Sequence, residues 1–203
     1  MPNLTHETAF RLAHEHVAKW EGGYFDHPND PGGVTMYGVS LMFLKSLGLV
    51  EGDIDGDGDI DRDDVLAITK ETARNIFHRH FWVIPKAEKL PPLVAIAFYD
   101  LAVNAGAGRA AIVLQEAINT IKPRSIKKLA GNVGPLTQTF ANQLAKEGRA
   151  LSLCLAYMDR RTDWYRRLAR AKPKTATFLN GWLNRTNACS RVLSETARRY
   201  GVA

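Results

Sequence analysis

Cysteines and long apolar runs are the scarcest features of this 203-residue chain. Its only cysteines are Cys154 and Cys189, and neither lies in a metal-binding spacing, which excludes a disulfide framework or a zinc finger as the basis of the fold. We expect both to be buried free thiols on helices. No segment approaches the roughly 18 apolar residues of a transmembrane helix, and the N-terminus lacks the basic and then apolar pattern of a signal peptide. We therefore expect neither a membrane span nor a cleaved leader.

Acidic residues are also scarce outside one short stretch. Residues 51–64 hold eight acids and one arginine, so the remainder of the chain carries 26 basic and 13 acidic side chains. A body this basic attracts polyanions. The sequence shows no zinc-finger spacing, aromatic RNA-binding strand or basic zipper, so we expect no nucleic-acid partner. Anionic polymers of the bacterial outer membrane or wall fit the charge, and we expect a monomer.

Apolar residues in helical spacing dominate the rest of the chain. Hydrophobic residues make up 45% and charged residues 24%, as in an ordinary globular protein. The length allows one buried core, or a catalytic domain with a small helical subdomain. The sequence contains no internal repeat and no low-complexity linker, so we expect its parts to pack together.

The first predicted helix ends at a carboxylate. Thr5 is a suitable N-cap, and apolar residues then recur every three or four positions. The buried stripe is expected to comprise Phe10, Ala13, Val17 and Trp20. Glu21 continues this stripe, and Gly22 and Gly23 can end the helix. A helix C-terminus and apolar neighbours both disfavour a charged carboxylate, which makes Glu21 a candidate proton donor. A helix-ending glutamate paired with a basic residue is the alternative.

Two further polar residues follow in a segment rich in glycine and proline. Asp30 lies nine positions after Glu21, and Thr35 lies five after Asp30, within a segment that can fold back as a hairpin. A second carboxylate with a hydroxyl beside it can hold and deprotonate a water molecule, as in inverting glycosidases. Turn chemistry for Asp30 and a strand position for Thr35 are the alternative interpretations.

This region resembles a known enzyme family. Glu-Gly-Gly-Tyr at residues 21–24, followed by Pro-Asn-Asp-Pro-Gly-Gly-Val-Thr-Met-Tyr-Gly-Val at residues 28–39, resembles the N-terminal signature of the glycoside hydrolase family 108 N-acetylmuramidases of bacteriophage endolysins. The resemblance implies that Glu21 is the proton donor. The order Glu, Asp, Thr is also similar to that of phage-type lysozymes, which implies catalytic roles for Asp30 and Thr35. Tyr24 and Tyr37 belong to the signature, and we expect both to bind substrate.

The acidic stretch has the spacing of a calcium loop. Counted from Asp53, aspartates occupy positions one, three, five, seven, nine and twelve, with glycine at six. This resembles an EF-hand loop, and the aspartate at position twelve is most similar to dockerin modules. We expect one structural calcium ion, bound by Asp53, Asp55, Asp57, Asp59, Asp61 and Asp64, with Asp59 contributing its backbone carbonyl. The Asp64 side chain is shorter than that of the usual glutamate and can ligate calcium through one oxygen only, so the sequence does not establish tight calcium binding. A solvated acidic loop is the alternative.

A helix apolar on all sides is expected from Leu93 to Val103, in the middle of a domain. Asp100 and Asn104 are then buried polar groups that need partners. Phe-Tyr-Asp-Leu-Ala-Val-Asn-Ala-Gly at residues 98–106 resembles a second segment of the family. The sharper interpretation of Asn104 is a groove-lining, substrate-binding residue, and internal hydrogen bonding is the alternative.

Helices are expected from Thr137 to the C-terminus. Gly-Pro-Leu-Thr at residues 134–137 and Gly-Trp-Leu-Asn-Arg at residues 181–185 resemble parts of the family's C-terminal peptidoglycan-binding region. The apolar faces are expected to be formed by Leu151, Leu155, Met158, Trp164 and Leu168. The basic faces, either solvated or in contact with anionic envelope surfaces, are expected to be formed by Arg160, Arg161, Arg166, Arg167 and Arg170.

The sequence therefore predicts a mainly α, lysozyme-like fold with a small β or irregular lobe and a helical C-terminal portion. We expect a catalytic region at residues 1–133, containing the loop 53–64, and a peptidoglycan-binding region at residues 134–203. The expected reaction is hydrolysis of the β-1,4 bond between N-acetylmuramic acid and N-acetylglucosamine, in the periplasm, by a protein made in the host bacterial cytoplasm. A lytic transglycosylase and a non-catalytic, calcium-dependent wall-binding module are the alternatives.

Overall fold

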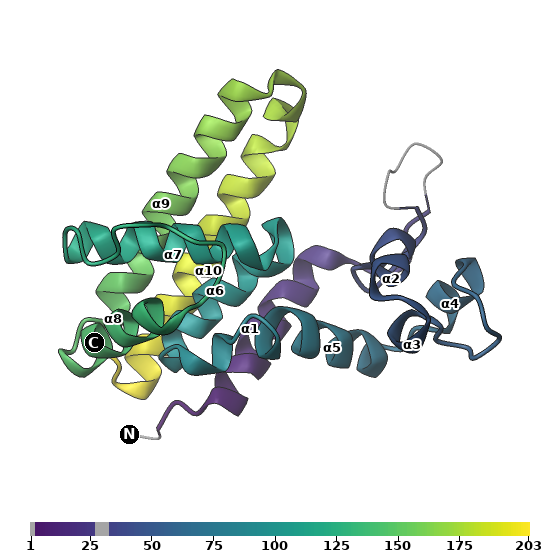
Figure 1. Cartoon of the computed structure of the whole chain (residues 1–203), viewed down its shortest axis with the longest axis horizontal. Helices are drawn as coiled ribbons and strands as arrows, with labels where there is room; N and C mark the ends of the chain where they lie inside the picture. Colours follow the sequence, from purple (N-terminus) through teal and green to yellow (C-terminus); the bar gives the residue numbers. More distant parts are fainter. Residues whose placement is uncertain (1–2, 27–32) are drawn as a thin grey trace. The chain divides into compact units, whose positions relative to one another are not determined.

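The computed structural model describes residues 3–26 and 33–203, which fold mainly into α-helices with one small sheet (Figure 1). The predicted mainly α, lysozyme-like fold with a small β lobe is confirmed. The chain forms two compact units, one of Met1–His16 with Arg79–Ala203 and the other of Val17–His78. Within the described residues, no helix combines the length and the apolar character that a membrane crossing requires. The expected division after residue 133 stays a prediction.

The larger unit is built around α6 (Pro92–Ala105). Its sequence is apolar on all sides, and every residue from Leu93 to Ala102 is buried. It packs against three long helices: α7 (Ala107–Ile121), α9 (Ala150–Ala171) and α10 (Leu179–Tyr200). The prediction of a central apolar helix is therefore confirmed, and polar groups on α6 have to find partners on its neighbours.

Shorter elements complete the larger unit. They are the first part of α1 (His6–Glu21), the π-helix η1 (Arg79–Val83), the 3-10 helix η2 (Ala87–Lys89), α8 (Pro135–Lys146) and the 3-10 helix η3 (Pro173–Phe178). Phe10 of α1 meets the rings of Trp82 and Tyr99 edge-on, with centroids 5.4 and 5.6 Å away. Such edge-to-face contacts add to the burial of apolar area, so this aromatic cluster fixes the start of α1 on the core.

Among its described residues, the smaller unit contains the sheet and four short helices. Strands β1 (Thr35–Met36) and β2 (Val39–Ser40) pair antiparallel, and Phe25 forms an isolated antiparallel bridge with Thr35. The helices are α2 (Leu41–Leu47), α3 (Leu49–Gly52), α4 (Arg62–Ala67) and α5 (Lys70–His78). The last residues of α1 also belong to this unit. The segment after Glu21 thus folds back on itself, as the sequence predicted.

Three predictions about helix faces are wrong. Trp20 was expected in the buried stripe of α1 but is 41% exposed, and Leu155 on α9 is 42% exposed. Arg161, expected on a basic outer face, is fully buried. The buried face of α9 runs through Cys154, Tyr157, Met158, Arg161 and Tyr165. These positions have helical spacing, so the arginine sits in the apolar stripe because a partner on α6 neutralises its charge. Cys154 and Cys189 are buried free thiols, as predicted.

Candidate functional site

Glu21 is the last residue of α1. The hydroxyl of Thr5 accepts a hydrogen bond from the backbone N–H of Thr8 at 3.2 Å, so the helix begins at the predicted cap. It ends as Gly22 adopts a positive φ of 69°. The Glu21 side chain is half-buried. It is therefore accessible to a substrate, although it lies at the end of a helix whose preceding turns are packed into the protein.

Exposed aromatic residues flank Glu21 in the sequence. Trp20, Tyr24 and Phe25 are 41%, 48% and 53% exposed. Large aromatic side chains with one end apolar and one face accessible are well suited to contact sugar rings. The exposure of Trp20 differs from the expectation that this residue is buried and gives the Glu21 carboxyl group an apolar environment.

The turn between β1 and β2 packs directly on the Glu21 side chain. Tyr37 and Gly38 are its two central residues, and both have positive φ, 49° and 82°, as a type I′ hairpin turn requires. A Cβ atom on Gly38 would lie 2.6 Å from Cβ and 2.9 Å from Cγ of Glu21. It would also lie 3.1 Å from Cζ of Phe77 on α5. The glycine therefore lets the hairpin hold the aliphatic part of Glu21 in place.

With Glu21 as the predicted proton donor, we expect Gly38→Ala to lower the catalytic rate by up to about 100-fold, because a displacement of about 1 Å at a catalytic group can have that effect. The new methyl group would displace Glu21, because it would lie closer to Cβ and Cγ of Glu21 than van der Waals contact between carbon atoms allows. The measurement is kcat on purified peptidoglycan. Gly48→Ala is the matched control, since Gly48 has a similar φ of 75° with nothing within 4 Å of an added Cβ. Equal losses in both variants would contradict the steric argument.

The other two predicted catalytic residues have different outcomes. Thr35 opens β1, and its backbone exchanges hydrogen bonds of 2.8 and 2.9 Å with Phe25. Its hydroxyl donates to the carbonyl of Gly33 at 3.4 Å. The sheet thus pairs Thr35 with the loop that follows Glu21, as a role near the acid requires. Asp30 lies outside the described residues. The roles of both residues stay predictions.

The two tyrosines of the signature lie on this same lobe. The hydroxyl of Tyr24 donates to Oδ2 of Asp26 at 3.1 Å and accepts from Arg62 at 2.6 Å. Tyr37 occupies the hairpin turn, with Nζ of Lys70 5.9 Å from its ring centroid. A basic residue thus contacts the hydroxyl of Tyr24 and another lies near the ring of Tyr37. The substrate-binding roles of both tyrosines stay predictions.

The acidic loop is organised by its own carboxylates. Asp53 accepts from the backbone N–H groups of Gly56 and Gly58 at 2.7 and 3.0 Å. Asp64, only 1% exposed, accepts from Ile54 at 2.6 Å and from Asp61 at 2.7 Å. Burial raises the pKa of Asp64, but these N–H donors outweigh it and leave the pKa below its usual value. Hydrogen bonds thus hold the first and last aspartates of the loop in place, and those to Asp64 favour its charged form.

The six aspartates predicted as calcium ligands converge in two groups of three. Carboxylate oxygens of Asp53, Asp55 and Asp57 lie within 4.8 Å of one another, and so do those of Asp59, Asp61 and Asp64. The negative charge of Asp57 raises the pKa of Asp59. The pKa of Asp55 is also raised, mainly because the carboxylate loses part of its hydration and also because neighbouring carboxylates repel its charge. Closely spaced carboxylate oxygens are the kind of ligand that a hard divalent cation prefers, and each group offers three of them. The single calcium ion bound by all six aspartates stays a prediction.

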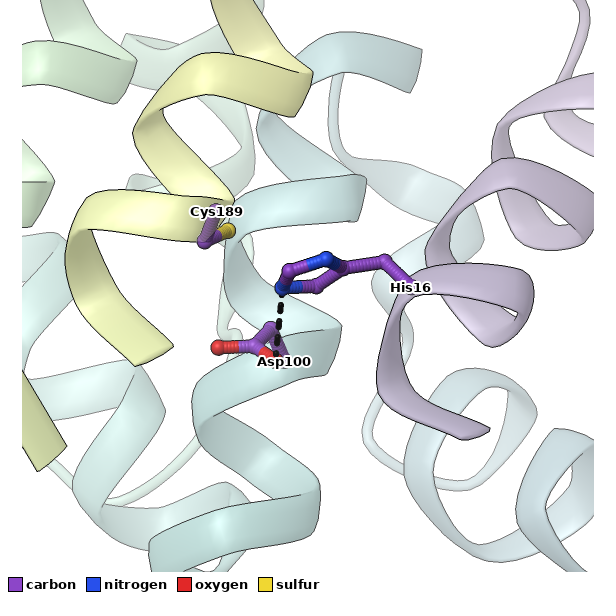
Figure 2. Close-up of side chains that lie close together, drawn as sticks. All are labelled: His16, Asp100 and Cys189. Carbon is purple, nitrogen blue, oxygen red and sulfur yellow. Dashed lines mark ion pairs between the residues drawn. The ribbon is translucent and has the colours of Figure 1, made fainter. Parts of the chain in front are cut away.

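A buried ionic cluster in the larger unit is a second group of potential metal ligands. His16 Nε2 lies 3.6 Å from Oδ1 of Asp100, with Cys189 beside them (Figure 2). Both carboxylate oxygens of Asp100 already accept hydrogen bonds, Oδ2 from Arg161 and Oδ1 from Arg185 at 2.9 Å. Two guanidinium charges oppose the entry of a cation. We therefore assign this cluster the structural role of joining α1, α6, α9 and α10.

Asn104 has a partner inside the larger unit. Its Oδ1 accepts a hydrogen bond from the hydroxyl of Tyr165 on α9. The Tyr165 ring stacks on Trp182 of α10, with centroids 4.9 Å apart and planes at 17°. The hydrogen bond agrees with the alternative interpretation, in which Asn104 bonds inside the protein. The stacking contact packs Trp182 of α10 against α9. The groove-lining role of Asn104 stays a prediction.

Two important residues were missed by reasoning from the sequence. The sequence predicts Arg161 on a basic face, although its spacing from Tyr157 and Tyr165 places it in the apolar stripe of α9. The sequence analysis assigns no role to Arg62, yet its side chain reaches Asp26 and Tyr24. As the only basic residue among the eight acids of residues 51–64, Arg62 was a signal that could have been used.

Comparisons with known proteins agree with this arrangement. Residues 14–106 match the family Glycosyl hydrolase 108, and residues 109–187 match the family described as Predicted Peptidoglycan domain. The structure is similar to that titled "Structure of Brucella abortus SagA", with a TM-score of 0.70 and 28% sequence identity over 93% of this chain and 95% of that chain. A comparison with curated proteins finds no match. These findings support a glycoside hydrolase that acts on peptidoglycan.

Proposed function

We propose that this peptidoglycan hydrolase is an N-acetylmuramidase that cleaves the β-1,4 bond between N-acetylmuramic acid and N-acetylglucosamine. The observation that carries the proposal is the accessible carboxyl group of Glu21, held by the Gly38 turn and flanked by exposed aromatic residues. It lies within the residues that match Glycosyl hydrolase 108. The family match supports glycoside hydrolysis, and the signature resemblance supports the choice of bond.

In the proposed reaction, Glu21 gives a proton to the glycosidic oxygen as the bond to the sugar breaks. Asp30 activates a water molecule or stabilises the positive charge that develops on the sugar ring, and Thr35 helps to position that water. The water oxygen bonds to the anomeric carbon, and the proton it releases passes to Asp30 or to the solvent. Proton exchange with the solvent then returns Glu21 to its acid form and Asp30 to its carboxylate form. The products are a reducing N-acetylmuramic acid end and an N-acetylglucosamine end with a free hydroxyl group.

The identity of the products tests the reaction. Wild-type protein is incubated with purified Gram-negative peptidoglycan, and the soluble fragments are analysed by mass spectrometry. Reducing N-acetylmuramic acid ends support the muramidase. Anhydro ends would instead identify a lytic transglycosylase, in which Glu21 acts without an attacking water. Binding without any product would favour the wall-binding module.

We further propose that the loop 53–64 binds one calcium ion that stabilises the smaller unit. Ligands that bind only the folded state stabilise it by about 2.7 kcal/mol at a concentration 100 times the dissociation constant. For a chain of this size, that corresponds to roughly 5–10 °C in Tm. We expect millimolar CaCl₂ to raise Tm by several degrees relative to EDTA, as measured by calorimetry.

Matched variants in the same stretch sharpen the calcium test. Asp57→Asn removes an exposed carboxylate at position five and should abolish most of the calcium-dependent rise in Tm. Asp63→Asn removes an equally exposed charge that lies outside the proposed ligand set and should leave the rise intact. A wild-type Tm that does not respond to calcium, or equal responses of both variants, would rule out this loop as the site.

An anionic envelope surface is the second proposed partner, with the helical hairpin of α9, η3 and α10 as its contact. Residues 164–194 contain seven basic and no acidic residues. The exposed basic side chains near the end of the hairpin are Arg166, Arg167, Arg170, Lys172 and Lys174. Most of this segment lies in the region that matches the peptidoglycan domain. Adsorption to intact sacculi should weaken as salt rises, and salt-independent adsorption would contradict this proposal.

The place of action follows from the substrate. We propose that the protein acts on peptidoglycan in the periplasm after synthesis in the cytoplasm of a host bacterium. Newly made protein found first in the cytoplasmic fraction and later in the periplasmic fraction of expressing cells would support this order of events. Protein that never reaches the periplasmic fraction while peptidoglycan is degraded would contradict it.

A further inference from the structure

Arg62 connects the acidic loop to the segment that follows Glu21. Nη1 of Arg62 donates to Oδ2 of Asp26 at 2.7 Å, and Nη2 donates to the hydroxyl of Tyr24 at 2.6 Å. The Tyr24 hydroxyl in turn donates to the same Oδ2 of Asp26 at 3.1 Å. The three side chains form a closed network across more than 35 positions of sequence, in which the tyrosine hydroxyl is both donor and acceptor.

The two ends of this network differ in how firmly they are held. Arg62 is the first residue of α4, directly after the N-cap Asp61, whose capping box with Asp64 fixes the start of the helix. Asp64 is almost fully buried. The partner residues Tyr24 and Asp26 lie on either side of Phe25, which forms an isolated bridge with Thr35. Arg62 therefore starts from a fixed backbone position, and its guanidinium group bridges the side chains on both sides of Phe25.

We propose that Arg62 is a positioning residue for substrate binding, holding the ring of Tyr24 and the segment beside Glu21 in the orientation that receives a saccharide. This inference rests on the proposed function, in which Tyr24 contacts the glycan. Arg62 itself does not touch the reacting atoms. Its rigid fork of donors can engage the carboxylate and the hydroxyl together, which a lysine cannot reproduce.

The contribution of the network to folding is small. The side chains of Arg62 and Asp26 are 54% and 35% exposed, and ion pairs of this exposure change the stability of a protein little. The effect of Arg62 should therefore appear in substrate binding and not in Tm. A residue with a merely structural role would change Tm and leave KM as it was.

Kinetics on soluble peptidoglycan fragments test the proposal. We expect Arg62→Ala to raise KM by about tenfold, the order of effect of one lost charge-assisted hydrogen bond, with kcat changed by less than about threefold. Arg62→Lys should recover part of the loss. Tyr24→Phe lacks the hydroxyl that Arg62 binds. The KM of the Arg62→Ala, Tyr24→Phe double variant should therefore be little higher than that of either single variant. Lys45→Ala removes an exposed charge on α2 of the same unit and should leave KM unchanged.

Each result separates this inference from the proposed function. If wild-type protein hydrolyses the fragments but Arg62→Ala has the KM of Lys45→Ala, the positioning role is wrong and the muramidase proposal stands. Additive effects of Arg62→Ala and Tyr24→Phe would also overturn the positioning role, since they would show that the two residues act separately. If wild-type protein forms no product, both proposals fail.

Discussion

Glu21→Gln is expected to reduce hydrolysis of peptidoglycan by about 100- to 10,000-fold, the usual contribution of a general acid. Glutamine has nearly the shape of glutamic acid, so the packing of Cβ and Cγ against Gly38 is preserved. What it lacks is the proton that the leaving oxygen must receive. The measurement is the release of reducing ends from purified peptidoglycan, with unchanged Tm as evidence that the variant is folded.

Glu15→Gln provides the matched control on the same helix. Glu15 is 56% exposed and accepts from Arg11 at 2.8 Å, one turn before it, so its replacement removes the same charge from α1 without reaching the site. We expect full activity from this variant. If Glu21→Gln kept wild-type activity while remaining folded, the acid of the reaction would have to be another residue.

Asp100→Asn is expected to destabilise the protein by about 3–5 kcal/mol, as when one partner of a buried ion pair is removed. Asp100 is 1% exposed and accepts from Arg161 and Arg185, which are 0% and 5% exposed. Asparagine would leave two buried guanidinium charges without a counter-charge, next to His16. For a chain of this length the loss corresponds to a fall of roughly 10 °C in Tm, which calorimetry or chemical unfolding can measure.

An exposed ion pair on α9 supplies the control for Asp100. Asp163 lies 3.7 Å from Arg160 and both side chains are accessible, so Asp163→Asn should change stability by less than about 1 kcal/mol. Similar losses for the two variants would show that the buried cluster contributes no more than a surface pair.

The pH dependence of stability should report the same cluster. Burial alone would raise the pKa of Asp100, but the charges of Arg161 and Arg185 outweigh it and hold the pKa below the ordinary value of 3.8. The unfolded chain therefore takes up the proton first as the pH falls. The stabilisation by Asp100 is present above about pH 4 and is lost as the pH falls through the lower folded-state pKa. Between these values, wild type should lose more stability than Asp100→Asn, and parallel curves would contradict this.

Local features of the site could be predicted because a few neighbouring residues determine them. Thr5 caps α1, Gly22 ends it after Glu21, and the spacing of the acidic loop brings its carboxylates together whatever surrounds them. The run of apolar residues on α6 required a central position, and the same argument required partners for Asp100. In each case the hydrogen-bonding and burial needs of a short segment leave few solutions.

The partners themselves were decided by tertiary structure. Spacing alone predicted that Trp20 would be buried and Arg161 exposed, and the structure reverses both. Arg161 is buried because Asp100, 61 positions earlier, neutralises it. Asn104 is held by Tyr165, which is equally distant in the chain.

The sequence by itself determined the mainly α fold, the end of α1 at Glu21 and the acidic loop, since helical periodicity, capping and turn residues act over a few positions. Only the tertiary structure decided that the Gly38 turn rests on Glu21 and that Arg62 reaches Tyr24 and Asp26. Contacts of this kind depend on how separate segments pack, and a side chain's own neighbours in the sequence do not specify which distant group it will meet.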